Sequence, residues 1–410
     1  MTATLPKTST NGTASAAGHL TTTSGAAPLP HAAPESLGLD PARLDRLYRV
    51  IEGHIAGGHY PGAQVAIARH GKLAAFRTFG RARIATNSAP VVPATDDTLW
   101  LLYSQSKMVT AAAVWQLVDD GALSFADRIS DHVPEFSRHG KREITVFQLL
   151  THQGGFPSAR PGPDVWGVEP RDRDLLRQTV CDFTLEWTPG SRIVYHPAAA
   201  HWVAAVLIET LTGLDYRQAI RERLLDPAGI RDVFLGVPAS EQARCAHMCH
   251  VEDGRMAVNP ESNSPRFYGA GIPGGGGFAT AAGMAAFYQM LLAGGTLNGV
   301  RVLSPRVIQY ATRNHTGDRT NPEGQPMNRG MTPAVRGYSP TMRGAGTIAS
   351  PSTFGHGGAG SSYSWGDPES GLSFTYLSNA RLDGDPATVD WHNRRLDQVS
   401  SLLHSALVEP

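Results

Sequence analysis

The order of predicted elements along the chain most constrains its fold. Residues 62–80 (GAQVAIARHGKLAAFRTFG) predict two strands about the turn HGK, close to the N-terminal end. Towards the other end, the segments GTIAS, SSYSW and GLSFTYLSN predict further strands, whereas residues 100–250 are rich in helix patterns. Strands at both ends of a helical middle predict one sheet assembled from both ends of the chain, with the middle inserted as a second subdomain.

Several helices can be placed by their end signals. Asp40 is a good N-cap, Pro41 suits a first helical position, and the following apolar residues fall on one face until Gly57 and Gly58 end the helix. Thr145 and Gln148 form a capping-box pattern, and Gly213 ends a helix over residues 200–212. The remaining helices are predicted over residues 104–120, about 280–293 and about 388–407.

The first 37 residues differ in composition from the rest. They are rich in Thr, Ser, Ala, Gly and Pro and contain no apolar run of 7 to 15 residues, so they fit neither a signal peptide nor a membrane span. We expect residues 1–37 to be a disordered leader. No internal repeat or long flexible linker interrupts the remainder, and we expect a single catalytic domain over residues 38–408.

Charge and cysteine content exclude several classes of partner. The chain has 36 basic and 36 acidic residues, a formal net charge of zero with neutral histidines, which gives no electrostatic footprint for nucleic acid or an anionic membrane. Three cysteines are too few for a disulfide framework. This content fits a reducing compartment, and we expect a cytoplasmic location. Composition says nothing about oligomeric state.

The segment WLLYSQSKMVTAAAVWQLVDDG, residues 100–121, places Ser104 and Lys107 on the opening turn of an otherwise apolar helix. Only four of the 36 basic residues are lysines, so the choice of lysine here is notable. A buried lysine can lose its proton and act as a base, whereas arginine stays charged. Residues at i and i+3 share a helix face. The pair therefore suggests a serine nucleophile with a lysine base.

Two later segments complete a pattern. LEWTPGSRIVYHPAAAHWVAAVLIETLTG presents Tyr195 just before a helix, and FGHGGAGSSYSWGDPESGLSFTYLSN presents His356 at the start of strands. With Ser104 and Lys107, these segments resemble the three motifs of the serine β-lactamase and penicillin-binding-protein superfamily: S-x-x-K, Y-x-N, and K-T-G or H-x-G. The resemblance runs from about residue 38 to 406. It implies an α+β fold, with an antiparallel sheet flanked by helices in residues 38–99 and about 270–408 and a mainly helical part over about 100–269.

The resemblance also implies roles for the motif residues. Ser104 would be the acyl-accepting nucleophile, Lys107 its base, and Tyr195 the group that passes the proton to the leaving group. The backbone N–H groups of Ser104 and Ala359 would form the oxyanion hole, since fixed backbone donors suit a tetrahedral oxyanion. His356 would hold the third-motif position.

The chain departs from the superfamily pattern at two positions. Pro197 replaces the asparagine of the second motif, and His356, followed by Gly357 and Gly358, replaces the lysine common in the third. An ordinary histidine is mostly neutral near pH 7. Both changes weaken recognition of carboxylate-bearing peptides and β-lactams, and they favour the esterase-like members related to class C β-lactamases.

These observations favour a serine-dependent carboxylesterase that acts on esters of short or bulky apolar groups. Three alternatives stay open. One is an acyltransferase, or a thioester-releasing or peptide-cyclising enzyme of secondary metabolism, on the same scaffold. The second is a β-lactamase or D-aminopeptidase, and the third is an inactive relative that serves as a binding protein. The substrate is expected to be a small-molecule ester or acyl compound, with no nucleic acid or membrane partner.

Other candidate residues are weaker. The resemblance places three aromatic residues near the mouth of the site, where they would line an apolar pocket: Trp166, Tyr268 and Trp365. His152, in LLTHQGG, is interpreted as a structural turn residue. CAHMCH, residues 245–250, lacks the spacing of a zinc site, and neither G-x-G-x-x-G pattern has the context of a dinucleotide site. We therefore expect no metal and no cofactor.

Overall fold

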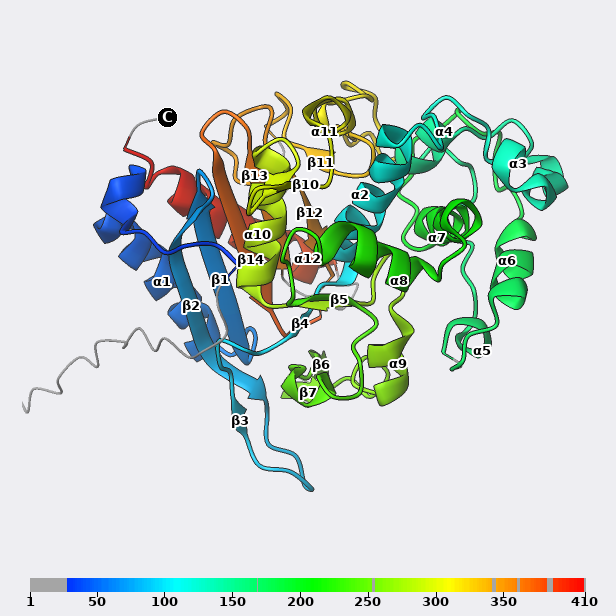
Figure 1. Ribbon diagram of the computed structural model, residues 1–410. Helices are drawn as coiled ribbons and strands as arrows, with labels where there is room; N and C mark the ends of the chain where they lie inside the picture. The colour runs from blue at the N-terminus through cyan, green and yellow to red at the C-terminus, as the bar shows by residue number, and fades with distance from the viewer. Residues whose placement is uncertain are drawn as a thin grey trace, which may run out of the picture.

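The computed structural model describes residues 28–167, 169–252, 255–340, 344–359, 362–381 and 386–408. Within these ranges, seven strands form one sheet whose neighbours all run antiparallel (Figure 1). Both ends of the chain contribute to it, which confirms the predicted α+β architecture. In spatial order the strands are β11 (Ala334–Val335), β12 (Phe354–Gly358), β13 (Ser362–Asp367), β14 (Leu372–Ser378), β1 (Gly62–Arg69), β2 (Lys72–Arg83) and β3 (Val92–Pro93).

Helices cover both faces of this sheet. On one face α1 (Pro41–Ala56) lies beside α12 (Pro386–His404), and on the other α10 (Ala281–Leu292) packs across β1 and β14 (Figure 1). Alternate residues of a strand point to opposite faces. Val65 and Ile67 of β1 accordingly enter the core beneath α1 and α12, whereas Ala66 and Ala68 enter the larger core shared with α10. Cover on both faces leaves β1 buried along its whole length.

The inserted part of the chain is mainly helical, as predicted. Its two longest helices are α2, which comes first, and α7. These two helices pack against each other inside the larger core. The helices are α2 (Ser106–Asp119), α3 (Ile129–His132), α4 (Val146–Leu150), α5 (Pro163–Trp166), α6 (Arg173–Cys181), α7 (Ala199–Thr212), α8 (Tyr216–Ile220) and α9 (Pro265–Ala270), and α11 (Pro305–Thr312) follows later.

Short helical turns and strands complete the described fold. The 3-10 turns are η1 (Pro34–Leu37), η2 (Tyr103–Gln105), η3 (Pro134–Gly140) and η5 (Gln242–Arg244), and the π-helical turn is η4 (Arg221–Leu225). The short strands are β4 (Trp100–Leu101), β5 (Val233–Leu235), β6 (Cys249–Glu252), β7 (Arg255–Val258), β8 (Gly277–Ala279), β9 (Thr296–Leu297) and β10 (Val300–Arg301).

Local signals placed several elements correctly. The side chain of Asp40 accepts hydrogen bonds from two backbone N–H groups at the start of α1, and the capping box of Thr145 is formed. The turn between β1 and β2 has φ of 52° at His70 and 75° at Gly71, and Gly213 ends α7 with a φ of 75°. The predicted strand GTIAS is wrong, since this segment forms bends and turns.

The predicted disordered leader is only partly tested, because residues 1–27 lie outside the described ranges. For residues 28–37 the prediction is wrong. Leu29 is buried in the larger core, the chain pairs with Leu73 through the N–H of Ala32 and the carbonyl of Pro30, and η1 follows. Buried apolar side chains and backbone hydrogen bonds to β2 therefore order a segment that its composition marks as unstructured.

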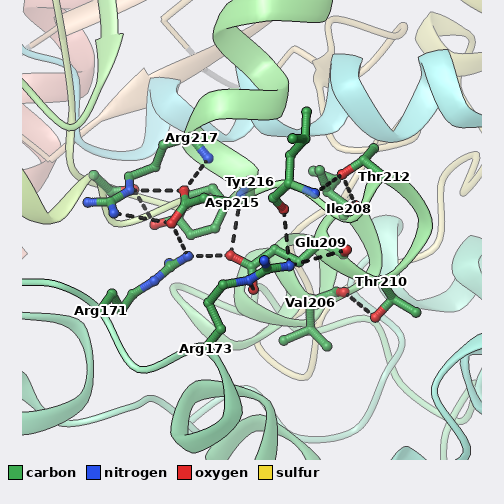
Figure 2. A network of polar contacts seen from close by, with 12 residues as sticks. Arg171, Arg173, Val206, Ile208, Glu209, Thr210, Thr212, Asp215, Tyr216 and Arg217 are labelled. Carbon is green, nitrogen blue, oxygen red and sulfur yellow. Dashed lines mark hydrogen bonds and ion pairs between the residues drawn. The ribbon is translucent and has the colours of Figure 1, made fainter.

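A buried charge network fixes the end of α7 (Figure 2). Arg171 contacts the carboxylates of Glu209 and Asp215, and Arg217 donates to Asp215 over 3.0 Å. The backbone N–H of Tyr216 donates to Glu209 over 3.2 Å. Mutual hydrogen bonds of this kind offset the cost of burying charge. The network joins α7 to the start of α8 and so holds the helix that directly follows the Tyr195 segment.

None of the helices in the described ranges combines the length and the apolarity that crossing a membrane requires.

Candidate active site

Ser104 lies in η2, the turn that leads into α2. The preceding residue, Tyr103, has a φ of 45°, which is unfavourable for a residue with a side chain and persists only where the surroundings impose it. Gln105 provides part of that constraint. Its amide nitrogen donates to Ser362 over 2.9 Å and its amide oxygen accepts from Ser364 over 2.5 Å, both on β13. The turn carrying Ser104 is therefore fastened to the sheet.

Lys107, on the first turn of α2, is fully buried. Its Nζ lies 3.0 Å from Oγ of Ser104, 2.7 Å from the carbonyl oxygen of Pro197 and 2.5 Å from that of Gly274. Burial lowers the pKa of Lys107 below the ordinary 10.5, and the charge of Arg329 lowers it further. The favourable effect of Tyr195 on the charged form does not reverse this shift.

The three contacts of Nζ match the valence of a neutral amine. A neutral amine has two N–H bonds and one lone pair, and each carbonyl oxygen can only accept. With the two carbonyls of Pro197 and Gly274 taking the two N–H groups, the lone pair is left for the hydroxyl of Ser104. The geometry can thus hold lysine as a base towards serine.

Tyr195 lies beside Lys107 of the first motif. Lys107 Nζ lies 5.2 Å from the centre of the Tyr195 ring, on its face. The rings of His152 and His356 lie 4.8 Å and 5.9 Å from the same ring, measured between centres. Segments that are distant in the sequence therefore converge around Tyr195, and the predicted motif residues do come together.

His356 lies in β12 and is buried. Its Nδ1 is 2.8 Å from the carbonyl oxygen of Gly357, so Nδ1 carries the proton in the neutral ring. Burial lowers the pKa of His356 well below 6.5, and the charge of Arg329 adds to the effect. The third motif therefore contributes a neutral ring, where the superfamily commonly has a lysine.

Gly358 brings β12 against the nucleophile turn. A Cβ built on this residue would lie 2.5 Å from the carbonyl oxygen of Leu102, a distance too short for any side chain. Only glycine permits this approach. Ala359, whose N–H was predicted for the oxyanion hole, directly follows Gly358. The close approach places the end of β12 beside the turn of Ser104.

We expect Gly358→Ala to reduce kcat/KM for ester substrates roughly 100-fold, because the added methyl group must push β12 away from the turn and displacements of about 1 Å have effects of that size. Steady-state kinetics test this, with circular dichroism to confirm folding. Gly53→Ala in α1 is the control, since a Cβ there meets nothing within 4 Å. Equal activity of Gly358→Ala and wild type would contradict the inferred role of the close approach.

Trp365 was expected near the mouth of the site, and this prediction is wrong. Trp365 lies in β13, where its ring stacks on His404 at 4.4 Å and its Nε1 donates to Ser400 over 3.1 Å. The neighbouring Ser364 faces the other way and donates to Gln105. Strand alternation puts Trp365 on the face beneath α12, away from the nucleophile turn.

The other two predicted pocket residues lie in the larger core. Trp166 is buried and packs edge to face with Phe267, at 6.1 Å between ring centres. Tyr268 is buried and packs edge to face with Phe278, at 5.2 Å. These contacts account for both side chains as packing residues, and their part in a substrate pocket stays a prediction.

His152 is buried and has a structural contact, as expected for a turn residue, with a φ of 61°. Its Nδ1 accepts a hydrogen bond from the backbone N–H of His196 over 3.2 Å. Burial lowers the pKa of His152 well below 6.5, and the charge of Arg329 lowers this pKa further, so the ring is neutral. Its position beside Tyr195 was not predicted.

The cysteines of CAHMCH are both buried, and burial raises the pKa of Cys245 and of Cys249 to about 12. Protonated thiols are poor metal ligands. In the part of the chain that the structure describes, no group of three or more His, Cys, Asp or Glu side chains is arranged to hold a metal ion.

Sequence reasoning missed three contributions to the site. The backbone carbonyl groups of Pro197 and Gly274 bind Lys107. Every residue has a backbone carbonyl, so residue type does not reveal these contacts. Arg329 lies with its guanidinium carbon 5.3 Å from the centre of the Tyr195 ring. One arginine in an arginine-rich chain carries no motif, so nothing in the sequence could have singled it out.

Comparisons with known proteins identify the family of the chain. The sequence model of the family described as Beta-lactamase matches residues 47–398. Esterase/beta-lactamase LipL of Mycobacterium tuberculosis is 26% identical over 324 residues, which cover 71% of each chain. A penicillin-binding protein homologue from Caulobacter crescentus has a TM-score of 0.71 at 28% identity, over 90% of this chain and 99% of that one. A family VIII carboxylesterase has a TM-score of 0.72 at 26% identity, over 88% and 98%.

Proposed function

Because the chain belongs to the beta-lactamase family of serine hydrolases, we propose that it cleaves carboxylic esters through an acyl-enzyme formed on Ser104. The observation that carries this proposal is the contact of Lys107 Nζ with Ser104 Oγ at 3.0 Å, in a buried setting that favours the neutral amine. A base within hydrogen-bond distance of a hydroxyl is the arrangement that activates a serine nucleophile.

In the first half-reaction, Lys107 takes the hydroxyl proton of Ser104 while Oγ forms a bond to the ester carbonyl carbon. The carbonyl oxygen becomes an oxyanion, which the backbone N–H groups of Ser104 and Ala359 would stabilise. The intermediate then expels the alkoxide of the ester. Tyr195 passes the proton from Lys107 to this alkoxide. An alcohol leaves, and an ester between the acyl group and Ser104 remains.

In the second half-reaction, water gives its proton to the same base as its oxygen adds to the acyl carbon. Collapse of this intermediate breaks the bond to Ser104 and returns the proton to Oγ. The carboxylic acid leaves, and Lys107 is again neutral. No further reactant is needed, which fits the purely acid–base character of the side chains gathered here.

Two departures from the superfamily pattern favour esters over β-lactams. Position 197 contributes its backbone carbonyl to Lys107, and as a proline it offers no side-chain amide to a substrate amide group. His356 is neutral because burial lowers its pKa. The related esterases LipL and the family VIII carboxylesterase support the same choice. A short or bulky apolar group on one side of the ester stays our expectation for the substrate.

A fluorophosphonate probe followed by peptide mass mapping tests the proposal. We expect one covalent adduct, on Ser104, together with hydrolysis of chromogenic esters. An adduct on another residue would remove the proposed mechanism. Product analysis with added alcohols and amines separates hydrolysis from acyl transfer, and nitrocefin turnover measures any β-lactamase activity.

A further inference from the structure

Ser106 directly follows the turn that carries Ser104, and its hydroxyl closes that turn. The residue is fully buried. Its Oγ donates to the carbonyl oxygen of Tyr103 over 2.6 Å and accepts from the backbone N–H of Gly277 over 2.9 Å. The backbone N–H of Ser106 donates to the same carbonyl oxygen of Tyr103, so residue 106 binds it twice. The proposed reaction gives Ser106 no chemical step, and these contacts leave its purpose to be explained.

Gly277, the first residue of β8, holds both sides of the turn. Its carbonyl oxygen accepts from the N–H of Leu102 over 2.8 Å, and its N–H donates to Ser106. A Cβ built on Gly277 would lie 2.8 Å from Oγ of Ser106, so a side chain there would displace the hydroxyl. The residues on either side of Ser104 are therefore tied to one glycine, and Ser106 supplies one of the two ties.

The contact with Tyr103 reaches Ser104 through the peptide bond. The carbonyl of Tyr103 and the N–H of Ser104 belong to one planar peptide unit and point in opposite directions. Fixing the carbonyl oxygen therefore fixes the direction of the N–H. The φ of 45° at Tyr103 is unfavourable, and relief of this strain would rotate the unit. The hydroxyl of Ser106 opposes that rotation.

We propose that Ser106 is a positioning residue whose hydroxyl aims the backbone N–H of Ser104 at the oxyanion. The inference rests on the proposed ester hydrolysis and adds a residue to which neither the motifs nor the proposed mechanism gives a role. Negative charge on the carbonyl oxygen develops in the transition state, so a misdirected donor weakens the transition state more than the bound substrate. The effect is therefore on kcat, with little change in KM.

Ser400 offers a matched control for removal of the hydroxyl. It is also buried, and its Oγ donates to the carbonyl oxygen of Gly344 over 2.5 Å and accepts from Nε1 of Trp365 over 3.1 Å. Ser106→Ala and Ser400→Ala each remove one donated and one accepted hydrogen bond, so we expect similar losses in melting temperature. Only Ser106→Ala should lower kcat for 4-nitrophenyl butyrate, by roughly tenfold or more, and slow fluorophosphonate labelling of Ser104 to the same degree.

A thiono ester, in which sulfur replaces the carbonyl oxygen of the same substrate, tests the oxyanion contact itself. Sulfur is a weak hydrogen-bond acceptor, so wild type should cleave the oxygen ester faster. Ser106→Ala should lower the ratio of the two kcat/KM values roughly fivefold or more, whereas Ser400→Ala should keep the ratio. Ser106→Cys puts a weaker donor in the same place and should lower the ratio less. This variant decides the matter if the alanine variant does not fold.

Two results would overturn the proposal. One is a kcat of Ser106→Ala equal to that of Ser400→Ala, and the other is an equal fall in the rates of both esters, with an unchanged ratio. Either would leave Ser106 with a packing role alone. Failure of the proposed function has a different signature, since the wild type would then not be labelled on Ser104 and its ester cleavage would survive Ser104→Ala.

Discussion

Replacing Lys107 with arginine is expected to lower kcat/KM for esters on the order of 1000-fold, nearly as much as Lys107→Ala. The size follows from the contribution of a positioned base to catalysis. Arginine has a side chain of similar length but a permanent positive charge, so it cannot accept the proton of Ser104. A guanidinium also lacks the lone pair that the two carbonyl contacts leave for the serine hydroxyl.

The comparison requires kcat/KM of the two variants and wild type on one chromogenic ester, with circular dichroism for folding. Lys72→Arg is the control, since Lys72 is exposed at the start of β2. Normal turnover by Lys107→Arg would mean that Lys107 acts only through its charge. A large loss in Lys107→Ala with little loss in Lys107→Arg would lead to the same conclusion.

Ser104→Ala is expected to reduce kcat by roughly 10⁴-fold or more, the range found when a covalent nucleophile is removed. The alanine variant keeps the backbone N–H of residue 104, so any residual rate reflects binding and the oxyanion hole. It should also lose the fluorophosphonate adduct. Ser137→Ala, at an exposed serine of η3, should behave as wild type. Substantial turnover by Ser104→Ala would remove the acyl-enzyme from the account.

Elements set by neighbouring residues were predicted well. The cap at Asp40, the capping box at Thr145 and the turn at His70 depend on side chains and dihedral angles within a few residues, so the sequence contains their whole cause. Both strands of the hairpin followed from the same local patterns. The arrangement of the sheet followed because strands at the two ends of the chain have few other ways to be buried.

Elements that depend on distant partners were predicted poorly. The GTIAS segment has strand-forming residues, yet the guanidinium of Arg336 binds the carbonyls of Gly346 and Thr347 and the chain turns there. Leu29 is ordered by a core that lies far along the sequence. The resemblance places Trp365 near the mouth of the site, whereas strand pairing decides which face of the sheet it occupies.

The residues of the candidate site also divide into those that local patterns predict and those that depend on distant partners. Ser104 and Lys107 could be found because a spacing of three residues, from η2 into the first turn of α2, brings them together. Tyr195 and His356 needed the resemblance to a family, since nothing local links them to residue 104. Arg329 could not be found at all, because its position beside the Tyr195 ring follows from the fold and not from a local pattern.

The titration of Lys107 tests the central claim most directly. The chain has four lysines, so incorporation of lysine labelled with ¹³C at Cε gives at most four NMR signals to follow with pH. Lys107→Ala assigns the signal, and Lys141→Arg removes the second lysine that is buried within the described ranges, whose pKa burial lowers to about 8. We predict that the Lys107 signal titrates below 10.5 and that kcat/KM falls with the same midpoint as decreasing pH protonates the amine. A Lys107 signal that remains that of an ammonium group up to pH 10.5 would contradict the account.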